Sequence, residues 1–123
     1  MNNCKFCNIP KGNVIIESEL SLAFYDKYPV NKGHILVIPK NHISSYFNLS
    51  PNEKLDVWNM VDKIKALLEN KYQPDAYNIG INIGEPAGQT IFHCHIHIIP
   101  RYNGDVDNPL GGVRGVIPSK QKY

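Results

Sequence analysis

The stretch Phe92–Arg101, FHCHIHIIPR, decides how the rest of the chain is interpreted, because it carries three of the protein's five histidines at alternate positions. Residues 91–99 are rich in β-branched side chains and are followed by Pro100, so the pattern predicts a strand rather than a helix. Successive side chains of a strand point to opposite faces. The histidines expected to share one face are therefore His93, His95 and His97. The other face is expected to carry Phe92, Cys94, Ile96 and Ile98, with Cys94 as a small core residue.

A row of three imidazoles is more than packing requires. A single histidine in such a place is usually a hydrogen-bonded structural residue, but three neutral rings cost more to bury than valine or isoleucine. Two kinds of chemistry use such a row: three imidazoles can hold a catalytic zinc, or the middle ring can attack phosphorus. Side chains strung along about 13 Å of strand cannot converge on one ion without severe bending. The spacing therefore favours a nucleophile at the middle position, His95, with the flanking His93 and His97 as catalytic donors to the phosphoryl oxygens.

The loop 84–90, GEPAGQT, stands directly before this segment and is rich in neutral hydrogen-bond donors. It offers backbone amides, the side-chain amide of Gln89 and the hydroxyl of Thr90, which together can surround an anion. Glycine-rich turns between strands are common and most of them bind nothing. The loop is evidence for an anion site only because the histidine segment follows it directly. Donors beside a nucleophile predict phosphoryl or acyl transfer.

Length and composition limit the class of protein. A chain of 123 residues is expected to form a single domain, 1–123. No apolar segment approaches the roughly 20 residues of a membrane span, and Met1–Cys4 lacks the regions of a signal peptide. A net charge of +2 with scattered Lys and Arg residues argues against nucleic-acid binding. Three cysteines, an odd number, favour a cytoplasmic protein over a secreted disulfide framework.

The expected secondary structure mixes strands with one long helix. Residues 50–53, SPNE, form a capping box with Pro at the first helical position, and the helix is expected to end near Asn70. Its apolar stripe predicts packing in the core. The other expected strands cover 13–17, 21–26, 34–38 and 77–83. An antiparallel sheet covered by one helix, an α+β domain, fits this order.

Several blocks of the chain resemble one known family. The pattern His-x-His-x-His at 93–97, AFYD at 23–26, GHILVIPKNHIS at 33–44 and NIGEPAGQTIFH at 82–93 are similar to successive blocks of the histidine-triad nucleotide hydrolases and transferases. The resemblance implies an antiparallel sheet with one long and one short helix, paired as a homodimer. It also implies cleavage at the α-phosphate of dinucleoside polyphosphates or nucleoside phosphoramidates, through a covalent nucleotidyl-histidine intermediate.

The same resemblance implies roles for individual residues. His95 resembles the family nucleophile, His97 its partner at the phosphate and leaving group, and His34 the fourth histidine of the site. Asp26 resembles the acidic residue that binds the ribose hydroxyls of a purine nucleotide. The positions that align with the phosphate-contacting loop are Asn82, Gly88, Gln89 and Thr90.

Cys4 and Cys7 form a Cys-x-x-Cys pair, which by itself suits a redox centre and half of a zinc site equally well. Bacterial-type family members resemble this chain in having such a pair, and there it belongs to a structural zinc site. The resemblance implies that the two further ligands are His42 and His93. No organic cofactor is expected.

Two other readings stay open. A non-catalytic nucleotide-binding or regulatory protein would keep all these residues, and a zinc-dependent hydrolase would use the metal directly in its chemistry. The resemblance also suggests that the tail 111–123 reaches toward the nucleotide site of a dimer partner, where Arg114 or a neighbouring Lys would contact a polyphosphate.

Overall fold

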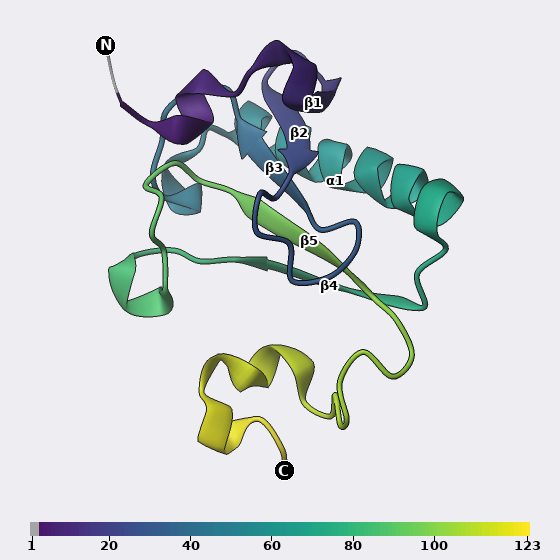
Figure 1. The fold of residues 1–123 in the computed structure, drawn as a ribbon. Coiled ribbons are helices and arrows are strands. Elements are labelled where there is room, and N and C mark those ends of the chain that lie inside the picture. The colour runs from purple at the N-terminus through teal and green to yellow at the C-terminus, as the bar shows by residue number, and fades with distance from the viewer. Residues whose placement is uncertain (1–2) are drawn as a thin grey trace.

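The computed structural model describes residues 3–123, so the first two residues of the segment considered above for a signal peptide lie outside it. The chain forms one five-stranded antiparallel sheet in the order β1-β2-β3-β5-β4, with the single long helix α1 across one face (Figure 1). The strands are β1 Val14–Glu17, β2 Ser21–Tyr25, β3 Ile35–Pro39, β4 Ala76–Ile81 and β5 Ile96–Arg101, and the helix is α1 Pro51–Tyr72. The predicted α+β class is confirmed.

The remaining helical elements of the described chain are short 3-10 turns of three to five residues. They are Lys5–Asn8, Lys11–Asn13, Tyr46–Asn48, Glu85–Ala87, Gly112–Val116 and Pro118–Lys120. Within residues 3–123, no helix combines the length and the apolar character that crossing a membrane requires. The C-terminal turns lie apart from the body of the sheet in Figure 1 and contact it at β4.

Helix α1 begins at the predicted capping box. The hydroxyl of Ser50 accepts from the Glu53 N–H at 3.1 Å, and the Glu53 carboxylate accepts from the Ser50 N–H at 2.9 Å. The helix continues past the expected end at Asn70 and stops where Gln73 adopts a left-handed conformation, with φ of 48°. Its buried stripe packs against the sheet through Val57, Met60, Val61, Ile64 and Leu68.

The two faces of the sheet have different neighbours. On the α1 face, Ile35 and Val37 of β3 join the main core. On the other face, the same strand contributes Leu36 to a smaller cluster with Phe24, against which Phe6 packs. Because strand side chains alternate, this second face also carries His97 of β5, and His34, directly before β3, lies on the same side. It is the face that carries the candidate site.

The histidine strand begins later than the sequence predicted. Residues 91–95 are not in a strand, and β5 starts at Ile96, so His93 and His95 precede it. The predicted start at residue 91 was wrong because the pairing partner is missing there. Strand β4 ends at Ile81, which pairs with Ile96, and the chain then leaves the sheet.

The other end of the histidine strand and its core face also differ in detail from the prediction. Pro100 does not end β5 but pairs with Tyr77 inside it. Cys94 lies in the main core, as predicted, and is 1% exposed. Burial raises the pKa of its thiol to about 11, so it stays protonated at neutral pH. Phe92, predicted to share that face, is 48% exposed.

Gly33 is a position where the backbone and the core both require glycine. Its φ is +90°, and an added Cβ would lie 3.0 Å from Tyr72 Cδ2 and 3.1 Å from Leu68 Cδ2. We expect Gly33→Ala to lower the free energy of unfolding by about 2 kcal/mol, measured by urea denaturation. Gly12→Ala is the control, because its Cβ would meet nothing within 4 Å. Equal stability of the two variants would contradict the prediction.

Candidate functional site

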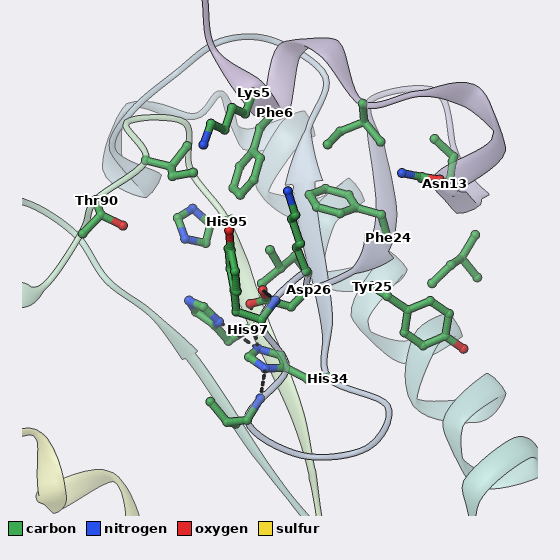
Figure 2. Close-up of a pocket in the computed structure, with 18 of the residues that line it drawn as sticks. Lys5, Phe6, Asn13, Phe24, Tyr25, Asp26, His34, Thr90, His95 and His97 are labelled. Carbon is green, nitrogen blue, oxygen red and sulfur yellow. Dashed lines mark hydrogen bonds and ion pairs between the residues drawn. The ribbon is translucent and has the colours of Figure 1, made fainter.

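A cavity of about 1010 Å³ lies on the sheet face opposite α1 (Figure 2). This volume suits a small-molecule ligand. Its polar wall includes Asp26, His34, His95 and His97, and its apolar wall includes Phe6, Ile9, Phe24 and Leu36. The cavity therefore combines a cluster of imidazoles with a surface on which an apolar ring system could rest.

The His95 ring is oriented by the backbone that precedes it. Its Nδ1 lies 2.8 Å from the carbonyl oxygen of His93, and a carbonyl oxygen only accepts hydrogen bonds. Nδ1 must therefore carry the proton. In the neutral ring this leaves the lone pair on Nε2, which is the form a nitrogen nucleophile needs. The side chain is 7% exposed and lines the cavity.

His34 and His97 form a second oriented pair. The backbone N–H of Val30 donates to His34 Nδ1 at 3.1 Å, so a neutral His34 carries its proton on Nε2. That Nε2–H donates to His97 Nδ1 at 3.0 Å. His97 consequently carries its own proton on Nε2. The rings of His95 and His97 lie with centroids 5.0 Å apart, and both line the cavity.

The local environment holds this second pair in its neutral form. Burial, together with the neighbouring rings of His95 and His34, lowers the pKa of His97 to about 4, against the opposing charge of Asp26. Burial also lowers the pKa of His34, against the opposing charge of Asp26. Both imidazoles are thus neutral hydrogen-bonding groups at neutral pH.

This low pKa predicts how stability changes with acid. Between pH 6.5 and about 4, the unfolded chain binds a proton at His97 that the folded chain does not bind. Stability is therefore unaffected by His97 above this window and falls as the pH is lowered through it. From pH 7 to pH 5, we expect wild type to lose about 1 kcal/mol more than His97→Gln, in urea titrations at each pH. Equal losses would contradict the prediction.

Asp26 follows β2 and lines the same cavity. One carboxylate oxygen accepts from the backbone N–H of Tyr28 at 2.8 Å, and the other lies 3.4 Å from His34 Nε2. The residues of the predicted loop that also line the cavity are Asn82, Gly88 and Thr90. Gly88 has a φ of +98°, which explains the need for glycine at this turn.

The structure does not bring Gln89 to the cavity. The side chain is 2% exposed and is used inside the loop: its carbonyl oxygen accepts from the Gly84 N–H at 2.8 Å. Its amide group donates to the carbonyl oxygens of Ser44 and Ile91 at 3.0 and 3.2 Å. Gln89 therefore shapes the loop from within.

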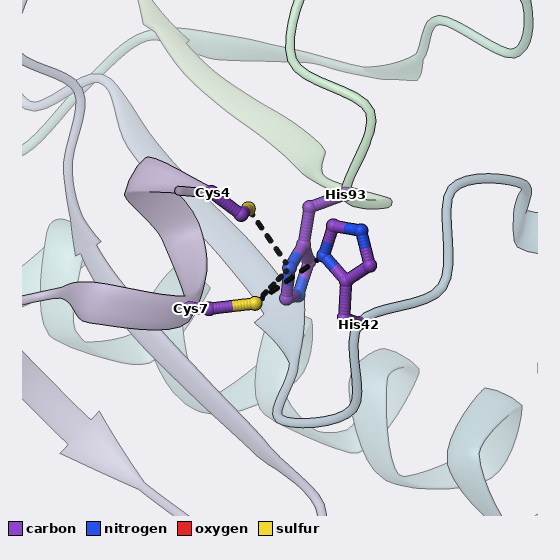
Figure 3. A group of neighbouring side chains, drawn as sticks. All are labelled: Cys4, Cys7, His42 and His93. Atoms are coloured by element: carbon purple, nitrogen blue, oxygen red, sulfur yellow. Dashed lines mark hydrogen bonds between the residues drawn. The ribbon is translucent and has the colours of Figure 1, made fainter. Parts of the chain in front are cut away.

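A second cluster, the Cys₂His₂ cluster, consists of Cys4, Cys7, His42 and His93 (Figure 3). Its four ligand atoms all lie within 4.8 Å of one another. The Nδ1 of His93 is 3.6 Å from the Cys4 sulfur and 3.5 Å from the Cys7 sulfur, and the Nδ1 of His42 is 3.3 Å from the Cys7 sulfur. The structure thus brings together all four residues that the resemblance implied.

The donor set of the Cys₂His₂ cluster fits a tetrahedral metal ion. Two sulfurs and two imidazoles are a common ligand set for structural zinc. The Nε2–H of His93 donates to the Pro39 carbonyl oxygen at 2.8 Å, which leaves the Nδ1 lone pair toward the sulfurs. Burial lowers the pKa of His93 and favours the neutral, metal-binding ring.

The three histidines of the triad therefore do not act as one row. His93 belongs to the Cys₂His₂ cluster, whereas His95 and His97 belong to the cavity. Sequence analysis missed Phe6, whose ring packs edge-on against His95 with centroids 5.0 Å apart. Its position between Cys4 and Cys7 was the available signal.

The tail has its own internal contacts. Arg114 donates to the Lys120 carbonyl oxygen at 2.9 Å and lies over the Tyr123 ring at 4.7 Å. These contacts do not test the expectation that Arg114 reaches a partner's nucleotide.

Comparison with solved structures supports the same architecture. A crystal structure of a HIT family protein from Bacillus anthracis has a TM-score of 0.79 and 42% identity, covering 85% of this chain and 77% of that one. A crystal structure titled as a Zn-bound histidine triad family protein from Mycobacterium smegmatis has a TM-score of 0.76 and 36% identity, covering 84% and 78%.

Comparison with curated proteins gives relatives of two named activities. The adenosine 5′-monophosphoramidase hnt1 of Schizosaccharomyces pombe is 40% identical over 113 residues, 89% of this chain and 82% of that protein. The asymmetrical bis(5′-nucleosyl)-tetraphosphatase of the same yeast is 40% identical over 101 residues, 81% and 56% of the two chains. The family model of the HIT domain matches residues 9–104. Because that match covers most of its length, this chain belongs to the HIT, or histidine-triad, family.

Proposed function

We propose that this protein hydrolyses or transfers nucleoside monophosphate groups, acting at the α-phosphate of dinucleoside polyphosphates or nucleoside phosphoramidates. The observation that carries the proposal is the hydrogen bond from His95 Nδ1–H to the His93 carbonyl oxygen, 2.8 Å long. It leaves a lone pair on Nε2 in a cavity large enough for a nucleotide. Relatives with phosphoramidase and tetraphosphatase names support the two substrate classes.

In the first step, the Nε2 lone pair of His95 forms a bond to the α-phosphorus. The bond from that phosphorus to the leaving group breaks, and the leaving group takes the electron pair. The Nε2–H of His97 donates a hydrogen bond to a phosphoryl oxygen or to the departing atom, and an amine leaving group takes its proton from water. The product is a nucleotidyl group bound to His95.

In the second step, water attacks the same phosphorus, its proton passes to bulk solvent, and the bond to His95 Nε2 breaks. The lone pair returns to His95, and the nucleoside monophosphate leaves. Backbone donors of the loop near Gly88 and the hydroxyl of Thr90 would stabilise the phosphoryl oxygens, since both residues line the cavity. Asp26 would accept hydrogen bonds from the ribose hydroxyls.

The purine would rest on the apolar wall. Phe24 and Leu36 are buried in the cluster beside the cavity, and Phe6 and Ile9 pack against it. Burying a flat ring against such side chains is favourable because it removes apolar surface from water. Asp26 lies near His34 and His97 in Figure 2, so a ribose bound to it would be close to the imidazole cluster.

We further propose that the Cys₂His₂ cluster binds a structural zinc ion. Four protein ligands close the coordination shell and leave no open position for a reacting water. Bound there, zinc supplies folding free energy rather than Lewis-acid chemistry. The Zn-bound relative supports this metal.

The test is intact-protein mass spectrometry after brief mixing with adenosine 5′-phosphoramidate or diadenosine tetraphosphate. We expect an acid-labile nucleotidyl adduct that appears with either substrate and is absent from His95→Ala. The substrate that turns over faster identifies the preferred class. AMP binding without adduct or turnover would reject the enzyme proposal in favour of a nucleotide-binding or regulatory protein.

Rapid chelation separates a zinc-dependent hydrolase from the proposed mechanism. If zinc took part in the chemistry, turnover would stop as soon as the ion left. With a histidine nucleophile and a structural ion, turnover declines only as the fold loosens. Stopped-flow activity and tryptophan fluorescence of Trp58, followed together after adding chelator, measure the two rates.

Homodimer formation, cytoplasmic location and the lack of nucleic-acid binding stay predictions from the sequence. The β4 strand lies at one edge of the sheet, with Ile79 40% exposed, so it offers one place where a second copy could pair. Light scattering on the full chain measures the assembly directly.

A further inference from the structure

Phe6 belongs to two sites at once. In the sequence it lies between Cys4 and Cys7, the two sulfur ligands of the Cys₂His₂ cluster. In space its ring packs edge-on against the His95 ring, with centroids 5.0 Å apart, and lines the nucleotide cavity. Any shift of the cysteine turn therefore moves a wall of the cavity and a neighbour of the nucleophile.

The turn that carries Phe6 contacts the sheet through its cysteines and through Phe6 itself. It is a 3-10 helix of four residues, Lys5–Asn8, and its N-cap Cys4 makes no side-chain capping hydrogen bond. The Phe6 ring packs against Phe24, with centroids 5.2 Å apart. The sulfur contacts of the Cys₂His₂ cluster and the packing of Phe6 and of Ile9, the C-cap of the turn, thus hold this segment against the sheet.

His93 provides a second connection between the same two sites. Its ring contributes Nδ1 to the Cys₂His₂ cluster, while its carbonyl oxygen accepts the His95 Nδ1–H at 2.8 Å. The rings of Phe6 and His93 also lie edge-on, with centroids 6.3 Å apart. A metal ion bound by His93 and the two cysteines would hold both of these neighbours of His95 in place.

We propose that Phe6 is a positioning residue that couples the Cys₂His₂ cluster to the nucleotide cavity, so that zinc and nucleotide bind cooperatively. The inference rests on the nucleotide-binding role proposed above. When bound zinc orders the turn, the Phe6 wall of the cavity is already in its binding position. Nucleotide binding is then more favourable, because less conformational entropy is lost in ordering that wall. Linkage requires the reverse effect of equal size: a bound nucleotide must tighten zinc binding by the same factor.

The experiment measures the zinc dissociation constant of the full chain by competition with a chromophoric chelator, with and without saturating AMP. We expect AMP to tighten zinc binding by about fivefold or more, near the lower end of typical allosteric coupling. The coupling ratio is the zinc dissociation constant without AMP divided by that with AMP. In Phe6→Ala this ratio should fall to within about twofold of one, because the side chain shared by the two sites is gone. Phe6→Leu, which keeps apolar volume and the fold, should give a clearly reduced ratio.

Two control variants show which side chain and which metal site produce the effect of AMP on zinc binding. Tyr28→Ala removes an exposed aromatic ring from the same cavity but not from the cysteine turn, so it should keep the wild-type ratio even if AMP binds more weakly. Cys4→Ser should abolish tight zinc binding. That loss separates the Cys₂His₂ cluster from Asp26, His34 and His97, whose ligand atoms also lie within 4.8 Å of one another.

The outcomes distinguish the two proposals. AMP that binds with no effect on the zinc dissociation constant overturns the coupling alone. A wild-type ratio that persists in both Phe6 variants also overturns it, since the connection would then run elsewhere. Failure of AMP to bind at all overturns the nucleotide-binding function and the coupling together.

Discussion

Replacing His95 with alanine is expected to lower kcat/KM by about 10⁴-fold or more, for whichever of the two nucleotide substrates is preferred. The variant lacks the Nε2 lone pair, and no covalent intermediate can form at this position. No other imidazole takes its place, because His97 presents an N–H and its Nδ1 already accepts from His34 at 3.0 Å. The measurement is steady-state release of AMP by chromatography.

The His95 experiment needs controls for folding and for the neighbouring ring. His95→Asn keeps a side-chain donor of similar reach and tests whether the loss comes from the missing nucleophile rather than from the missing hydrogen bond to His93. His97→Gln should lose less, about 10²-fold, since it removes a proton donor but not the nucleophile. If His95→Ala and His97→Gln lost activity equally, the assigned roles would be wrong.

Removing the proposed zinc ion from the Cys₂His₂ cluster is expected to produce the largest change in stability. An ion that binds only the folded state stabilises it by about 4 kcal/mol when free zinc is near a thousand times its dissociation constant. For a domain of this size, such a loss lowers the unfolding temperature by about 10 °C or more. Differential scanning calorimetry before and after dialysis against a chelator measures the change.

The variant Cys7→Ser tests the same site without a chelator. It should unfold at the temperature of the metal-depleted wild type, because three ligands hold the ion far less tightly than four. Chelator should then cause no further shift. A large additional shift in Cys7→Ser would mean that the stabilising ion lies outside the Cys₂His₂ cluster.

Much of the fold was predictable because local patterns determine it. The capping box at Ser50 and the apolar stripe behind it mark a helix whose start requires no tertiary information. Strands β2 and β3 were predicted within a residue at each end, since their apolar runs stop at polar or proline positions. The resemblance in the histidine segment also led to the right family.

Only the tertiary structure shows that the three histidines belong to two different sites. Strict alternation would place His93 beside His95, but β4 ends at Ile81 and leaves residues 91–95 without a pairing partner. Because His93 is not in a strand, its side chain can lie against the sulfurs of Cys4 and Cys7. Its carbonyl oxygen remains to orient His95. Where a neighbouring strand ends is a property of the whole sheet, and a local pattern does not contain it.

Two further assignments needed coordinates for a related reason. Gln89 was predicted as a phosphate contact from its residue type, yet its amide is fully used by backbone groups from two segments of the chain. Phe6 received no role from the sequence, yet its ring packs edge-on against His95. The sequence by itself determined which residue types stand near the site, through local periodicity and spacing. The tertiary structure decided which hydrogen bonds and contacts each side chain makes, because those depend on segments far apart in the chain.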